Sequence, residues 1–208
     1  MILASASPAR RRVLRAAGVD PIVQVSGIDE DAITASLPDG TPPEQVVGVL
    51  AEAKARSVLA TRADADPDVV VVGCDSMLSF DGRLLGKPHT PEAAGAQWRE
   101  MRGRSAQLLT GHHLIRRRDG HHDLSSGGTS STTIYFADTP DDAIDAYVAT
   151  GEPLEVAGAF TLDGYGGWLV DRIEGDPSSV IGIGLPLVRR LLEHLGVSLT
   201  DLWRAPFA

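Results

Sequence analysis

The chain has 208 residues, 43% of them hydrophobic and 23% charged, a composition typical of a folded globular protein and unlike that of disordered or fibrous chains. Its single cysteine excludes a disulfide scaffold, and no stretch reaches the roughly 20 apolar residues that a membrane span requires. The formal net charge of -9 argues against a nucleic-acid polymer as partner, so an anionic ligand needs a local cluster of basic residues.

The arginines of residues 10–12 follow a very short apolar start, which is the wrong order for a signal peptide. We therefore expect a cytoplasmic protein that associates with no membrane.

The predicted strands and helices alternate along the chain. Four Ser-Pro or Thr-Pro pairs indicate helix starts, because a hydroxyl N-cap often precedes proline at the first helical position. The second of these starts fits a capping box from Thr41 to Glu44. In chain order we predict a strand over 2–4, a helix over 8–18, a strand over 22–25, a helix over 41–61, a strand over 69–72 that ends in 73–76, a helix over 91–102, a hairpin over 107–136, and helices over 140–150 and 185–195.

The strand that begins at Val69 is expected at the centre of the sheet. Its four consecutive valines are typical of a strand covered by helices on both faces. The hairpin over 107–136 is predicted to turn at Asp119-Gly120, a favoured two-residue turn. These elements predict an α/β fold with one elongated, mixed, twisted sheet and flanking helices, in a single domain over 1–208.

The first candidate site lies where the strand over 2–4 meets the first helix. The sequence from Ser5 to Arg12 places small hydroxyl residues and arginines around a helix N-terminus, whose free N–H groups favour anions. The same sequence also fits a capped helix with solvated arginines.

Lysine is rare in this chain. Lys54 and Lys87 are the only lysines among 19 basic residues, and lysine is preferred where a compact charge meets a phosphate. Lys54 shares a helical stripe with the apolar residues Leu50 and Val58, so its amine either snorkels to solvent or meets an anion. Lys87 stands between Gly86 and Pro88, which fix the backbone beside its charge. If these lysines bind phosphate, replacing either with Met should cost little stability, because the stem is retained.

Two acidic positions are candidates for metal or water chemistry. Asp75 is expected at the carboxyl end of the valine strand, where α/β folds place ligands, although an aspartate there can also cap a turn. The segment Ser26 to Asp31 is either a metal-ligand loop or a polar connection.

Taken together, the motifs resemble the Maf family of nucleoside triphosphate pyrophosphatases, also called septum formation inhibitors. The resemblance runs nearly end to end and rests on the joint order and spacing of short motifs. The residues that carry it are 3–10 (LASASPAR), 26–30, 53–55, 74–76, 85–88, 109–111, 151–154 (GEPL), 157–160 and 173–176 (IEGD).

The resemblance implies an elongated sheet split by a central cleft, a homodimer, and a divalent metal cation (Mg, Mn or Co) as cofactor. It implies hydrolysis of a nucleoside triphosphate to the monophosphate and pyrophosphate, in a house-cleaning or division-arrest role. The implied catalytic residues are Asp75 as general base with Lys54 and Lys87; Ser7 and Arg10 join the lysines on the triphosphate, and Glu30 and Asp75 bind metal. The rival interpretation is a non-catalytic regulator of septum formation that binds a nucleotide or a protein.

Three substrate-binding positions depart from the pattern of many relatives. Ala9 replaces an arginine, Ser76 a threonine and Asp163 a glutamine, at positions associated with base selectivity. An ionised carboxylate accepts hydrogen bonds only, so Asp163 should favour cytosine or 7-methylguanine over thymine if it faces the base. Alternatively, Asp163 is a solvated loop residue.

Overall fold

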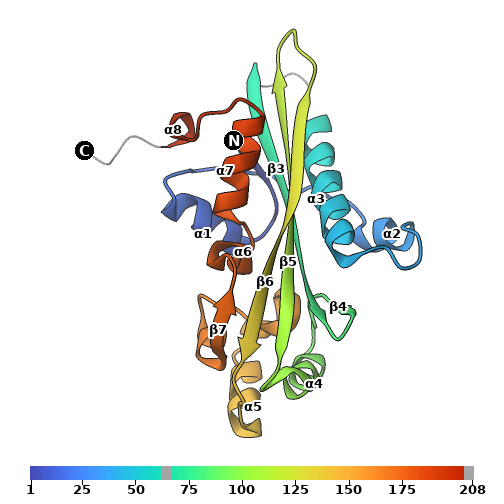
Figure 1. Ribbon diagram of the computed structural model, residues 1–208, viewed down its shortest axis with the longest axis vertical. Coiled ribbons are helices and arrows are strands. Elements are labelled where there is room, and N and C mark those ends of the chain that lie inside the picture. Colours follow the sequence, from blue (N-terminus) through green and yellow to red (C-terminus); the bar gives the residue numbers. More distant parts are fainter. Residues whose placement is uncertain (62–66, 204–208) are drawn as a thin grey trace. The chain divides into compact units, whose positions relative to one another are not determined.

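The computed structural model describes residues 1–61 and 67–203. These residues form a mixed sheet of seven strands in the order β2-β1-β3-β5-β6-β7, with β4 paired to β3, and helices flank it (Figure 1). The predicted α/β fold with a mixed sheet is confirmed, whereas the elongated shape and the central cleft stay predictions. Within the described ranges, no helix is long and apolar enough to cross a bilayer.

The strands are β1 (Ile2–Ala4), β2 (Ile22–Val23), β3 (Asp68–Phe80), β4 (Arg83–Leu85), β5 (Ser105–Arg118), β6 (Leu124–Phe136) and β7 (Val170–Glu174). The α-helices are α1 (Pro8–Ala16), α2 (Glu30–Ala35), α3 (Pro43–Ala60), α4 (Pro91–Met101), α5 (Asp141–Ala149), α6 (Pro177–Ile181), α7 (Leu185–His194) and α8 (Leu199–Leu202). Three short 3-10 helices are η1 (Glu152–Glu155), η2 (Ala157–Ala159) and η3 (Tyr165–Leu169).

The chain divides into two compact units, each described by itself below. The first unit comprises Met1–Asp75, Thr110–Ser130 and Gly182–Ala208, and the second comprises Ser76–Leu109 and Ser131–Ile181. Strands β3, β5 and β6 contribute residues to both units. The single domain over 1–208 stays a prediction beside this division.

In the first unit, helices cover both faces of the sheet. Strand β1 pairs in parallel with β2 and β3, and successive residues of a strand face opposite sides. Val72 therefore packs with α1 and α7 on one face, whereas Val71 packs against α3 on the other. Figure 1 shows α3 on one side of β3 and β5, and α1 and α7 on the other. This two-sided burial confirms the central strand that the valines predicted.

Two glycines let α3 approach the sheet closely. A Cβ on Gly73 of β3 would lie 2.0 Å from the carbonyl oxygen of Ala51, and a Cβ on Gly111 of β5 would lie 2.3 Å from that of Val47. Both clashes are with the backbone of α3, which cannot move aside as the end of a flexible side chain could. Helix α3 thus packs so close to the sheet that only glycine fits at these two positions.

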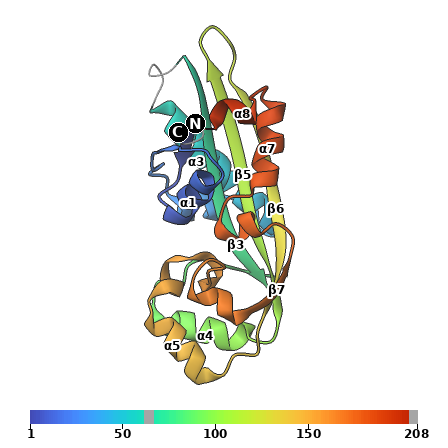
Figure 2. The same cartoon turned by 90° about the vertical axis from the view of Figure 1, so that its left-hand side faces the viewer.

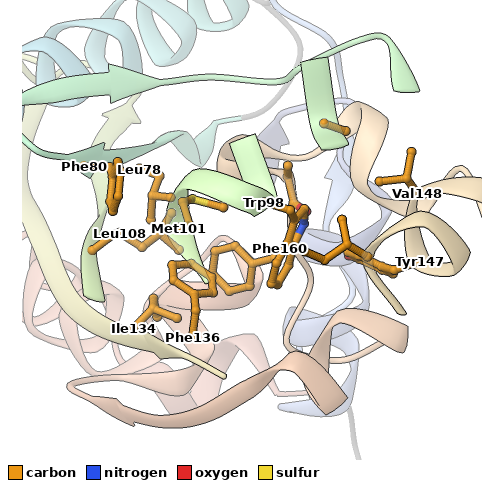
Figure 3. Packing of buried hydrophobic residues seen from close by; sticks show 14 residues of the cluster. Leu78, Phe80, Trp98, Met101, Leu108, Ile134, Phe136, Tyr147, Val148 and Phe160 are labelled. Carbon is orange, nitrogen blue, oxygen red and sulfur yellow. The ribbon is translucent and has the colours of Figure 1, made fainter. Parts of the chain in front are cut away.

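The second unit has an aromatic core. The ring of Trp98 makes T-shaped contacts with the rings of Phe136 and Tyr147, at centroid distances of 5.4 and 5.5 Å. Its indole nitrogen donates a hydrogen bond to the carbonyl of Ala159. Figure 3 shows these rings together with Phe160. Helices α4 and α5 lie side by side in this unit (Figure 2). Buried aromatic pairs of this kind stabilise a core beyond their area alone.

Most of the predicted helices are confirmed to within a residue or two. Ser7 and Thr90 cap α1 and α4, accepting hydrogen bonds from the backbone nitrogens of Arg10 and Ala93. Helix α5 ends before Gly151 and α7 before Gly196, both with positive φ. The hydroxyl caps at Ser7 and Thr90 and the two terminal glycines are therefore confirmed.

The capping box at Thr41 is wrong. Thr41 donates its hydroxyl to the carbonyl of Pro38, Pro42 occupies the N-cap without a side-chain hydrogen bond, and α3 begins at Pro43. The reason is the second proline, because a residue that precedes proline is kept out of the helical region. Pro140, rather than Thr139, likewise occupies the N-cap of α5.

The hairpin turn and two strand boundaries also differ from prediction. Strands β5 and β6 are joined by residues 119–123, and only Gly120 of the expected turn pair has a positive φ, whereas the expected turn needs two. Strand β2 stops at Val23. Strand β3 does not end in 73–76 but continues to Phe80, because β4 extends the sheet by pairing with 78–80.

Candidate active site

The candidate site of the first unit is built around one buried ammonium group. Lys54 Nζ lies 2.7 Å from Asp75 Oδ1 and 2.9 Å from Glu30 Oε1. Lys54 and Asp75 are 7% and 5% exposed, so this pair is shielded from water, while the Glu30 side chain is 49% exposed. Of the two alternatives for Lys54, the structure favours contact with anions over snorkelling, and the anions are the protein's own carboxylates.

The second oxygen of Asp75 is free of the protein. Asp75 Oδ2 is buried and has no hydrogen-bond partner among the described residues. A buried carboxylate oxygen without a partner is costly, and such atoms often serve a ligand, a metal ion or a water. The carboxylate therefore has one oxygen held by Lys54 and one available for chemistry.

The sequence predicted Asp75 at the carboxyl end of its strand, but Asp75 lies inside β3, which continues to Phe80. Strand β1 pairs with β3 only as far as Gly73, so β3 continues past the end of β1. Asp75 is the second residue beyond the last one that pairs with β1, and its side chain is buried.

Glu30 reaches Lys54 because the acidic segment is a helix start. Asp29 caps α2 by accepting from the backbone nitrogen of Ala32 at 2.9 Å, and Glu30 is the first helical residue. The preceding loop is tied to α3 by a 2.6 Å hydrogen bond from Ser57 Oγ to the carbonyl of Ser26. The segment is therefore a loop that leads into a capped helix, and its role as a source of metal ligands stays a prediction. Ser57 carried no sequence signal.

Arg10 is held by three separate segments of the first unit. Its Nε donates to Gly182 O at 2.8 Å, and its Nη1 donates to Ser5 Oγ and Cys74 O, both at 2.9 Å. The description of solvated arginines fits the exposed Arg11 and Arg12 but not Arg10. Arg10 fixes the loop before α1, which carries Ser7, against the backbone that leads to Asp75.

Cys74 is a buried structural residue. Its thiol is enclosed, and burial raises the pKa of Cys74 to about 11, although Arg10 and Lys54 oppose the shift. A thiol with so high a pKa carries almost no thiolate at neutral pH and is a poor nucleophile.

His112 of β5 holds the segment that receives Arg10. Its Nε2 accepts from the backbone nitrogen of Gly184 at 2.8 Å, two residues from the carbonyl that Arg10 contacts. Burial, and next the charge of Arg10, lower the pKa of His112 to about 4. The histidine is therefore neutral in the folded protein at pH 7, and no sequence signal pointed to this role.

This neutral histidine should make stability depend on pH. Between pH 6.5 and 4 the unfolded chain protonates His112 and the folded chain does not, so the free energy of unfolding should fall as the pH falls, by about 1.4 kcal/mol per pH unit at most. We expect His112→Gln to flatten this slope in urea unfolding at pH 7, 6 and 5. His122→Gln, in the exposed loop 119–123, is the control and should keep the parental slope. Equal slopes in parent and His112→Gln would contradict the assignment.

The donor set fits a small, hard cation shared with a substrate. Within the described residues there is no cluster of three or more histidine, cysteine or acidic side chains that would enclose a metal ion. The open Oδ2 of Asp75 and the half-exposed carboxylate of Glu30 supply oxygen ligands. One or two carboxylates completed by substrate phosphates are the usual environment of protein-bound Mg²⁺.

The other predicted site residues are distributed between the units. Ala9 lies in α1 of the first unit. In the second unit, Ser76 follows Asp75 in β3, and Lys87 has a half-exposed side chain 3.7 Å from Glu155. Asp163 is exposed, just before η3. Ser7, Arg10, Glu30, Lys54 and Asp75 all belong to the first unit, where Lys54 contacts Glu30 and Asp75, and Arg10 contacts the carbonyl of Cys74 beside Asp75.

A surface hollow of the first unit lies elsewhere. It has a volume of about 360 Å³ and is lined by residues that include Gln45, Glu52 and His113. None of the predicted site residues lines it.

Comparison with known proteins gives a consistent result. A model of a family described as Maf-like protein matches residues 1–195. A protein of Nocardia farcinica is 61% identical over 99% of this chain and 97% of its own length. Proteins of Rhodococcus erythropolis and Saccharopolyspora erythraea are 60% and 56% identical, over 98% and 100% of this chain and 96% and 98% of their own lengths. All three relatives bear the name nucleoside triphosphate pyrophosphatase.

Proposed function

The chain belongs to the Maf-like protein family and is a nucleoside triphosphate pyrophosphatase, and from that premise we propose how its residues carry out the hydrolysis. The proposal rests above all on Lys54, which is shared between Glu30 and Asp75, and on Asp75 Oδ2, which has no hydrogen-bond partner within residues 1–61 and 67–203. The expected products are a nucleoside monophosphate and pyrophosphate.

Asp75 is the proposed general base. Its Oδ2 takes a proton from a water molecule while the water oxygen attacks the α-phosphorus. The bond from that phosphorus to the bridging oxygen breaks, and the electron pair leaves with pyrophosphate. Lys54 holds the other oxygen of Asp75, which supports an orientation of the carboxylate that keeps Oδ2 toward the water.

Ser7, Arg10, Lys54 and Lys87 are the proposed triphosphate ligands. A triphosphate carries several negative charges, and this protein is acidic overall, so local cations and helix N–H groups must hold it. The contacts of Arg10 support a fixed position for Ser7 at the start of α1.

Asp75 and Glu30 are the proposed ligands of a divalent cation. When bound, such a cation neutralises the charge that develops on the phosphates during the reaction. Lys54 then stands beside the same two carboxylates and keeps them in place.

The activity is tested by incubating the full-length protein with a panel of nucleoside triphosphates and Mg²⁺ or Mn²⁺, and measuring pyrophosphate and monophosphate. We expect equal amounts of both products and loss of release after EDTA, with recovery when Mg²⁺ is added. A protein that binds nucleotides but leaves all of them intact would contradict this proposal and support the non-catalytic regulator of septum formation. The homodimer, the cytoplasmic location and the house-cleaning or division-arrest role stay predictions.

Asp163 should set the base preference. Thymine would present more acceptors than donors to this carboxylate, and a buried mismatch costs about 1–3 kcal/mol, or roughly 10- to 100-fold. We expect higher kcat/KM for cytidine-type or 7-methylguanosine triphosphate than for thymidine triphosphate. Asp163→Gln should shift this ranking toward thymidine triphosphate. A parent enzyme that prefers thymidine triphosphate, or a variant with an unchanged ranking, would contradict the assignment.

A further inference from the structure

The motif Gly151 to Leu154 has no role in the chemistry proposed above. Gly151, with a φ of 76°, ends α5, and Glu152 opens η1. The Glu152 carboxylate makes its hydrogen bonds to a different part of the second unit, the segment 161–166. This contact joins two sequence motifs that lie several residues apart.

Three donors of this segment converge on Glu152. Oε1 accepts from Thr161 Oγ1 at 2.5 Å and from the backbone nitrogen of Gly166 at 3.0 Å. Oε2 accepts from the backbone nitrogen of Tyr165 at 3.0 Å. Burial raises the pKa of Glu152, but these hydrogen bonds outweigh it and hold the pKa below its usual value. The carboxylate is thus ionised at neutral pH, as an acceptor for three donors should be.

The segment 161–166 also packs tightly against the Glu152 carboxylate. A Cβ on Gly164 would lie 2.3 Å from Glu152 Oε2, although its φ of -136° suits any residue. A side chain at this position would therefore have to displace the carboxylate from its hydrogen bonds. Asp163 is exposed and lies between the anchored residues Thr161 and Tyr165.

We propose that Glu152 is a positioning residue that sets the nucleobase preference of the enzyme by fixing the segment that carries Asp163. This inference rests on the proposed function, since it assumes that Asp163 faces the base. A glutamine at 152 would turn an NH₂ group toward at least one of the three donors, so the segment would lose its fixed conformation.

The inference is tested with a double-mutant cycle on the full-length protein. The measured quantity is the ratio of kcat/KM for deoxycytidine triphosphate to that for thymidine triphosphate. We expect Glu152→Gln and Asp163→Gln each to lower this ratio about 10-fold. The double variant should lower it no further, because both changes remove the same contribution of Asp163 to the base preference. Gly164→Ala, whose Cβ would displace the carboxylate sterically, should lower it as well.

Glu100→Gln is the matched control. Glu100 is an exposed carboxylate of α4 in the same unit and pairs with Arg83, so its variant should keep the parental ratio. Amide hydrogen exchange adds a readout that needs no turnover. The amides of Tyr165 and Gly166 should be protected in the parent and exchange at least about 10-fold faster in Glu152→Gln, but not in Glu100→Gln.

The outcomes separate the inference from the proposed function. A parent protein that releases no pyrophosphate from any nucleotide contradicts the function and, with it, this inference. With an active parent, the inference alone fails if the ratio is unchanged in Glu152→Gln and Gly164→Ala, if it is unchanged in Asp163→Gln, or if the effects of the two glutamine variants simply add.

Discussion

Asp75→Asn should lower kcat by a factor of about 100 or more, because an amide cannot accept the proton of the attacking water. The variant should fold normally. Its amide oxygen still accepts from Lys54, and Lys54 keeps its contact with Glu30. Exchanging the carboxylate acceptor of this ammonium for a neutral amide oxygen costs about 1 kcal/mol, which lowers the Tm of a chain of this size by about 2–4 °C.

The same substitution elsewhere in β3 provides the control. Asp68 begins this strand and pairs with Arg116 on the surface. Asp68→Asn should therefore leave kcat within about twofold of the parent. Near-parental turnover in Asp75→Asn would refute its role as base.

Lys54→Met should both abolish most of the activity and destabilise the fold. Removing one partner of a buried ion pair leaves the other charge uncompensated, which costs about 3–5 kcal/mol. Asp75 would be that charge, since its one partner among the described residues is the Lys54 amine and its side chain is 7% exposed. The structure thus corrects the expectation that a retained stem makes this substitution cheap.

Two further variants test this explanation. Lys87→Met should lower triphosphate affinity or turnover at almost no cost in stability, because Lys87 is half-exposed and its pair with Glu155 spans 3.7 Å. Adding Asp75→Asn to Lys54→Met should restore most of the lost stability, since no uncompensated buried carboxylate remains. Urea unfolding gives the free energy of unfolding of the parent, Lys54→Met, Lys87→Met and the double variant. A Lys54→Met variant as stable as Lys87→Met would contradict the buried ion pair.

The fold was predictable where local chemistry acts alone. The caps at Ser7 and Thr90 and the consecutive valines of β3 each follow from nearest neighbours. The start of α3 and the full length of β3 were not predictable in this way. They depend on a second proline and on the pairing of β3 with β4, two features that compete with the local pattern.

The candidate site was predictable as a set of residue types but not as a geometry. The rarity of lysine singled out Lys54, yet the sequence alone did not place its amine between Glu30 and Asp75. That placement needs α2 and α3 folded together. The contacts of His112 and Glu152 escaped prediction because their partners are backbone nitrogens of distant segments, which have no sequence signature.

The close seating of α3 has a consequence for how this enzyme tolerates change. Gly73 and Gly111 bear no chemical group, yet any side chain there would push the helix off the sheet and carry Lys54 with it. The distance between Lys54 and Asp75 is therefore set partly by two positions that carry no side chain. Substitution should be as poorly tolerated at these glycines as at the charged residues, and an engineer who wishes to alter the reaction has to leave them alone.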